Sequence, residues 1–218
     1  MISIMTNVKK IAHIIGNGTS RIGINLIDLK NKGIVFGCNA LYRDFIDSDF
    51  ILPDYLVAID KAITEEIKTS TFPLERFIDP PEDEKWEPVE VHWGNSMSED
   101  WDAVRPRSNA GTNAILEAIK RDFTQLYIFG FDFLIINKNM ALDNIYNDTS
   151  CYKNETKVTL RDTRNRMKYI GWIIENNPNI NFTFCYPRDI LNNGVYKPVA
   201  DNCSFIDFNE LYSRISKC

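Results

Sequence analysis

Polar side chains that could contact a phosphorylated nucleoside follow four short apolar segments of the chain. The first segment, residues 11–15, runs into a glycine-rich turn, Gly16-Asn17-Gly18-Thr19-Ser20. The other three segments are followed by Asn39, Asp60 and Asp132. Glycines let a backbone approach a ligand closely, and the first N–H groups of a following helix favour an anion. We therefore predict that the turn binds a phosphate and that the amide and carboxylate groups bind the ribose and base.

The elements that must position these groups follow from the hydrophobic pattern. Apolar runs alternate with segments of helical period: strands are expected at 11–15, 33–37, 55–59, 126–129 and 181–185, and helices at 20–30, 113–123 and 159–176. This order is typical of an α/β domain with a Rossmann-like, mostly parallel sheet and helices on both faces. Ligands bind such sheets beyond the carboxyl ends of the strands, so the four polar segments are expected at one edge.

One domain is expected for residues 1–218, since a chain of this length with 44% hydrophobic residues can bury a full core. Residues 79–106 interrupt the alternation with several prolines, an acidic run and Trp86, Trp93 and Trp101. We expect this segment to leave the sheet as a long loop. Its tryptophans either stack on a sugar or base, or pack as a small core that holds the loop in place.

Charge and cysteine content exclude several classes of protein. The net charge of -5 argues against binding of nucleic acid through a general basic surface, although a local basic groove stays open. The five cysteines are scattered, with neither zinc-knuckle spacing nor the density of a disulfide scaffold. No apolar run approaches the ~18 residues of a membrane span. We expect a cytoplasmic protein without a membrane span, and the sequence is compatible with a homo-oligomer.

A second glycine-containing segment precedes the clearest helical pattern. It supplies positive charge, hydrogen-bond donors and close backbone approach through Arg107, Ser108, Asn109, Gly111 and Thr112. A helix that begins here would present its N-terminal N–H groups to a second anion. The alternative is an ordinary helix cap beside a solvent-exposed arginine.

Three stretches, KKIAHIIGNGTS, CNALY and LYIFGFDF, resemble the bacterial sialyltransferases of glycosyltransferase family 42 and the related pterin diphosphokinase-like proteins. The resemblance covers residues 8–135 and implies a Rossmann-like fold, an activated nucleotide donor and transfer without a metal. It places Asn17 and Asn39 against the nucleotide and Asp132 near its ribose. It also implies that Arg107 and residues 108–111 surround the sugar or phosphate of the donor.

The chain departs from this family at the groups that assist the leaving phosphate. Phe133 stands where the sialyltransferases have a tyrosine, so another residue has to supply the hydrogen bond or charge. The replacements we predict are Tyr146, Tyr152, Arg161 and Arg164. They belong to a tyrosine-rich and basic segment, 140–166, that could close over the phosphates as a lid, together with Lys153, Lys157 and Arg166. The alternative for these cations is a solvated helix face.

The general base also differs. The sialyltransferases have a histidine after the GFDF segment, whereas the only histidines of this chain are His13 and His92, both before it. Asp60, which stands where the family has an amide, Asp132 and His92 are the predicted bases. A sialic acid donor is therefore disfavoured. The run Asp47-Ser48-Asp49 matches the metal-binding pattern of other glycosyltransferases, but its place before Pro53 favours a surface turn, and we predict no metal site.

The sequence thus predicts a metal-independent glycosyltransferase that moves a sugar from a nucleotide-sugar donor to a hydroxyl acceptor, with no further cofactor. The acceptor is a glycan, a small molecule or a hydroxymethylated base in bacteriophage DNA, and in the last case the protein works in the host cytoplasm. Two alternatives stay open. One is a pterin-kinase-like diphosphotransferase that uses ATP and Mg²⁺, and the other is a nucleotide-binding module without catalysis.

Overall fold

A single parallel sheet organises the molecule. The computed structural model describes residues 10–45, 52–81, 108–136, 144–152 and 160–216. Seven strands form the sheet in the order β4-β3-β2-β1-β5-β6-β7, and every neighbouring pair is parallel. Their bounds are β1 Ile11–Ile15, β2 Ile34–Cys38, β3 Tyr55–Val57, β4 Phe77–Ile78, β5 Gln125–Phe129, β6 Asn181–Tyr186 and β7 Cys203–Asp207. The predicted Rossmann-like α/β fold is confirmed.

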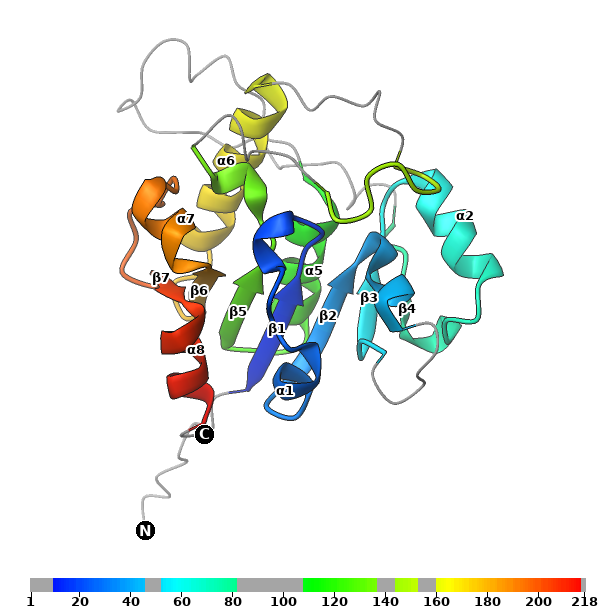
Figure 1. Cartoon of the computed structure of the whole chain (residues 1–218), viewed down its shortest axis with the longest axis horizontal. Coiled ribbons are helices and arrows are strands. Elements are labelled where there is room, and N and C mark those ends of the chain that lie inside the picture. The colour runs from blue at the N-terminus through cyan, green and yellow to red at the C-terminus, as the bar shows by residue number, and fades with distance from the viewer. Residues whose placement is uncertain (1–9, 46–51, 82–107, 137–143, 153–159, 217–218) are drawn as a thin grey trace.

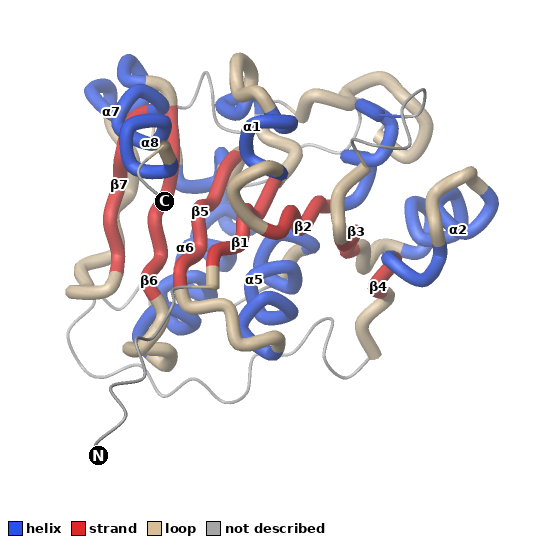
Figure 2. The backbone as a smooth tube through the Cα atoms, turned by 90° about the horizontal axis from the view of Figure 1, so that it is seen from below, coloured by secondary structure: helices blue, strands red, loops and turns tan. Residues whose placement is uncertain are grey.

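Helices cover both faces of this sheet (Figures 1 and 2): α1 and α8 lie on one face, and α5 and α6 on the other. The helices span α1 Leu26–Lys30, α2 Lys61–Thr69, α5 Ala110–Lys120, α6 Leu160–Glu175, α7 Arg188–Asn193 and α8 Phe208–Ile215. Short 3₁₀ turns are η1 Thr19–Arg21, η2 Asn39–Phe45, η3 Leu74–Arg76 and η4 Asp132–Leu134. None of the helices among the described residues has the length and apolar character needed to cross a membrane.

Two apolar clusters, one on each face, hold the layers together. Ala12 and Ile14 of β1 belong to the cluster under α5 and α6, whereas Ile15 belongs to the one under α1 and α8. All three side chains are fully buried. This alternation explains why β1 is apolar at every position except His13, because a strand in a covered parallel sheet is buried on both faces.

The position of β1 creates the crevice at the top of the sheet. Ile15 pairs with Gly37 of β2 on one side and with Phe129 of β5 on the other. From β1 the chain builds the sheet outward to β4 and then returns through α5 to place β5 on the opposite side of β1. Such a reversal of strand order opens a ligand-binding crevice between the loops that follow the two strands.

Several local predictions differ from the structure. A continuous helix over 20–30 is wrong, because Asn25 caps a separate short helix, α1, after the turn η1. The helix predicted from 113 begins at Ala110, where the Asn109 and Thr112 side chains form a capping box. The strand predicted over 55–59 ends at Val57. Strands β4 and β7 and helices α2, α7 and α8 were not predicted.

Candidate functional site

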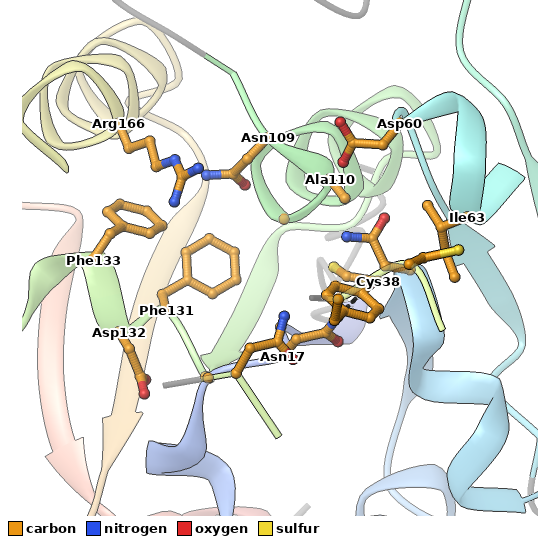
Figure 3. A pocket seen from close by; sticks show the side chains of 18 of the residues that line it. Asn17, Cys38, Asp60, Ile63, Asn109, Ala110, Phe131, Asp132, Phe133 and Arg166 are labelled. Atoms are coloured by element: carbon orange, nitrogen blue, oxygen red, sulfur yellow. Dashed lines mark hydrogen bonds between the residues drawn. The ribbon is translucent and has the colours of Figure 1, made fainter. Parts of the chain in front are cut away.

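A cavity of about 490 Å³ opens at the carboxyl edge of the sheet, over β1 and β5. Its lining includes the four polar residues that follow the predicted strands: Asn17, Asn39, Asp60 and Asp132. The wall also includes residues from the starts of α2 and α5, the loop after β5, the segment 144–152 and Arg166 of α6 (Figure 3). The cavity therefore lies at the position where a parallel sheet with this strand order binds ligands.

The glycine-rich turn after β1 packs tightly against the loop after β5. The N–H groups of Gly16 and Gly18 donate to the carbonyl oxygens of Phe129 and Gly130 at 2.8 and 3.0 Å. A Cβ atom at Gly16 would lie 2.7 Å from the Gly130 oxygen, and one at Gly18 would lie 2.3 Å from the Asp132 carboxylate. Glycine is required here so that the two loops can touch each other.

The Asp132 carboxylate lies at the start of η1, where a phosphate was predicted to bind. It accepts hydrogen bonds from the Ser20 N–H at 3.1 Å, the Thr19 hydroxyl at 3.3 Å and the Ser20 hydroxyl. Burial raises the pKa of this carboxyl, and the hydrogen bonds from Ser20 and Thr19 oppose that rise. Figure 3 shows the carboxylate directed away from Asp60 and Asn109. This geometry does not favour Asp132 as a general base, nor Thr19 and Ser20 as phosphate ligands.

Asn17 and Asn39 supply hydrogen-bond acceptors in the cavity wall. The Asn17 amide nitrogen donates to the Tyr152 hydroxyl at 3.2 Å, while its Oδ1 atom has no partner among the described residues. The Oδ1 atom of Asn39 is likewise buried without a partner in this part of the chain. Asn39 also has a left-handed backbone, with φ of 50°. Buried acceptors are nearly always satisfied, so each of these oxygens requires a donor that the described residues do not supply.

Only one of the two predicted tyrosines reaches the cavity. The side chain of Tyr146, within the segment 144–152, is buried and does not line the cavity. Its hydroxyl donates to Asp44 at 2.6 Å and accepts from Arg21 at 2.8 Å. Tyr152 lines the cavity.

The Tyr152 hydroxyl accepts two hydrogen bonds. It accepts from the Asn17 amide and from the Ala40 backbone N–H. Burial raises the pKa of this phenol, so it stays protonated at neutral pH. With both acceptor positions of the oxygen occupied, the hydroxyl can form a further hydrogen bond only as a donor.

The start of α5 and a side chain of α6 form the positive part of the cavity. The Asn109 side chain accepts from the Thr112 N–H at 3.0 Å, and Thr112 Oγ1 accepts from the Asn109 N–H at 2.9 Å. Ala110 and Gly111, whose N–H groups lack intrahelical acceptors by helix geometry, line the cavity. Arg166 lines it as well, beside Asn109 and above the phenylalanine rings of the loop after β5 (Figure 3).

Of the two predicted arginines, only the side chain of Arg164 is among the described residues. Arg164 is exposed and does not line the cavity. The side chain of Arg161 lies outside the described residues. The same holds for His92, Arg107, the three tryptophans and the Asp47-Ser48-Asp49 run. Ser108, by contrast, is described and buried. Arg166 was one of several cations assigned to a lid, and the structure places it in the cavity wall.

Asp60 is the carboxylate that remains available in the cavity. It is the N-cap residue of α2, but its side chain makes no capping hydrogen bond and is exposed. Figure 3 shows it across the cavity from Phe133. Aspartate at an N-cap usually bonds to the helix N–H groups. The described N–H groups of α2 therefore do not occupy its carboxylate oxygens.

Among the described residues, no three His, Cys, Asp or Glu side chains gather in a group that could hold a metal ion. Comparison of the chain with protein-family models, with curated proteins and with solved structures gives no match. The resemblance to family 42 therefore stays a prediction.

Proposed function

We propose that this protein is a glycosyltransferase that binds a nucleotide-sugar donor in the cavity over β1 and β5. The observation that carries the proposal is the chemistry of the lining. One cavity at the reversal point of the sheet is lined by two amides whose buried oxygens have no partner among the described residues, an exposed carboxylate, a phenol, and a positive helix start with an arginine. A phosphorylated nucleoside offers matching groups, namely hydroxyl and N–H donors together with phosphate oxygens.

The proposed orientation of the donor follows from this distribution of charge. The phosphates lie against the N–H groups of Ala110 and Gly111 and the guanidinium of Arg166, because both sources are positive. The nucleoside hydroxyls lie toward Asn17 and Asn39, whose side-chain oxygens accept no hydrogen bond from the described residues and would accept from the ligand.

In the transfer step, the acceptor hydroxyl oxygen attacks the anomeric carbon of the donor sugar. A carbon–oxygen bond to the acceptor forms while the bond from the sugar to the phosphate oxygen breaks, and its electron pair leaves with the phosphate. Asp60 takes the acceptor proton as general base. Arg166, the start of α5 and the Tyr152 hydroxyl stabilise the negative charge on the leaving phosphate.

Incubation with UDP-sugars, CMP-sugars and ATP, followed by mass spectrometry, tests the proposal. Slow release of UDP or CMP from a sugar donor supports glycosyl transfer, because water replaces the missing acceptor. Turnover of ATP only with Mg²⁺ would instead indicate a diphosphotransferase. Tight binding without turnover of any compound would indicate a nucleotide-binding module.

A further inference from the structure

We infer that Arg43 and Glu66, neither of which lines the cavity, are positioning residues that hold Tyr152 and the segment around it in the cavity wall. We call residues 144–152 the strap. The inference rests on the proposed function for its effect on ligands, whereas the contacts that support it are independent of any ligand.

The strap forms one wall of the cavity. Asn144, Asn147, Cys151 and Tyr152 all line it. Its first residues are attached to the turn after β1, because the Ile145 N–H donates to the Asn17 carbonyl at 2.9 Å and Asn144 forms a bridge with Gly18. This end is therefore held by backbone contacts, but Tyr152 lies at the other end.

Arg43 and Glu66 fasten that other end. The Arg43 guanidinium donates to the Thr149 hydroxyl at 2.7 Å and to the Ser150 carbonyl at 3.0 Å. Glu66 accepts from the Ser150 hydroxyl at 2.7 Å and is paired with Arg43. The same guanidinium lies 5.8 Å from the centre of the Tyr152 ring.

The pair joins three parts of the cavity wall. Arg43 belongs to η2, which begins at Asn39, and Glu66 belongs to α2, which begins after Asp60. Because η2 and α2 both hold the strap, the Tyr152 hydroxyl keeps a fixed position relative to the Asp60 carboxylate. Loss of the pair therefore loosens the segment that carries Tyr152, although the bonds from Asn17 and Ala40 to its hydroxyl remain.

The experiment uses Glu66→Gln, which keeps the shape of the side chain and removes its charge. Glu65→Gln is the matched control, since Glu65 lies next to it on α2, is exposed and is 3.8 Å from Lys68. Hydrogen exchange read by mass spectrometry reports the N–H groups of Asp148 and Tyr152, which are hydrogen-bonded within the strap. Titration with UDP and CMP reports binding.

We expect exchange in the strap to be about tenfold faster in Glu66→Gln than in Glu65→Gln, with exchange in β1 and β5 unchanged. The affinity of Glu66→Gln for the nucleotide that the wild type binds should fall by about tenfold. The affinity of Arg43→Lys should fall less than that of Arg43→Ala, because lysine retains the positive charge. Equal strap exchange in the two glutamine variants overturns the inference. If Glu66→Gln does not fold, the two Arg43 variants decide it by the same readouts. If exchange in the strap is faster in Glu66→Gln but the wild type binds neither nucleotide, the positioning role of Arg43 and Glu66 is supported and the proposed function is contradicted.

Discussion

Asp60 and Asp132 are two carboxylates in the wall of one cavity, and their surroundings give them different roles. Asp132 is buried and accepts three hydrogen bonds from Thr19 and Ser20. Asp60 is exposed and does not cap the helix that it precedes. We therefore propose that Asp132 stabilises the loops at the carboxyl edge of the sheet and that Asp60 is the general base.

Replacing Asp60 by asparagine should lower donor hydrolysis by about 10²-fold or more, because a general base contributes at least that much. The affinity for UDP or CMP should change by less than about threefold, since a neutral amide can still bond to hydroxyl groups. Mass spectrometry and calorimetric titration check the two parts. Unchanged hydrolysis in Asp60→Asn would remove this residue from the mechanism.

Replacing Asp132 by asparagine should destabilise the fold instead. Its amide group would face the N–H and hydroxyl donors of Thr19 and Ser20, so the free energy of unfolding should fall by about 2 kcal/mol. Urea denaturation measures this, with Asp201→Asn as the control at an exposed loop position. Equal stability of the two variants would contradict the assignment.

At the scale of elements, the turn after β1 and the loop after β5 act as one unit. Gly18→Ala should cost about 1–3 kcal/mol of stability, because its Cβ atom would lie 2.3 Å from the Asp132 carboxylate. In an Asp132→Ala background the same substitution should cost much less, since the clashing group is absent. Denaturation of the four proteins of this double-mutant cycle measures the coupling, and additive effects would show that the two loops do not constrain each other.

The sequence could predict which strands end at the carboxyl edge of the cavity, but not the orientation of the side chains that follow them. Asn17, Asn39 and Asp60 follow buried apolar runs, and that pattern was enough to bring them to one edge. The turn of Asp132 toward Ser20 depends on a contact 112 residues apart. Arg164 and Arg166 lie two positions apart on one helix and so point about 200° apart around its axis, and only the packing of α6 decides which of them faces the cavity.

The elements that escaped prediction are short or weakly patterned. β4 has two residues, and β7, with the sequence CSFID, is mostly half-buried and lacks the apolar run of a central strand. Helix α2 buries Ile63 and Ile67, four residues apart, between charged side chains. These edge elements obtain their stability from packing on the sheet and carry little signal of their own.

At the scale of the whole molecule, a buried histidine should make stability depend on pH. His13 is fully buried on β1, and neither ring nitrogen has a partner among the described residues. Burial lowers its pKa from 6.5 to about 4. Between about pH 6.5 and pH 4, His13 therefore binds a proton in the unfolded chain but not in the folded protein. The free energy of unfolding should fall as the pH drops through this range.

Between pH 7 and pH 4 this histidine should account for a loss of about 3 kcal/mol. His13→Leu, of similar volume, should remove that part of the pH dependence. A further loss below about pH 4.5 should persist in both proteins, because hydrogen bonds from Arg43, Tyr42 and Ser150 outweigh burial and lower the pKa of Glu66 to about 2. Thermal unfolding across the pH range checks this, and parallel curves for the two proteins would contradict it.

The most direct test of the account is calorimetric titration of the wild type and Asn17→Ala with UDP, CMP and ATP. We expect saturable binding of at least one nucleotide to one site of the wild type. Binding to Asn17→Ala should be weaker by about 1–3 kcal/mol, because the variant lacks the oxygen that the ligand satisfies and the amide that contacts Tyr152. Absence of binding to the wild type, or equal affinity in a correctly folded variant, would contradict the assignment of this cavity to a nucleotide.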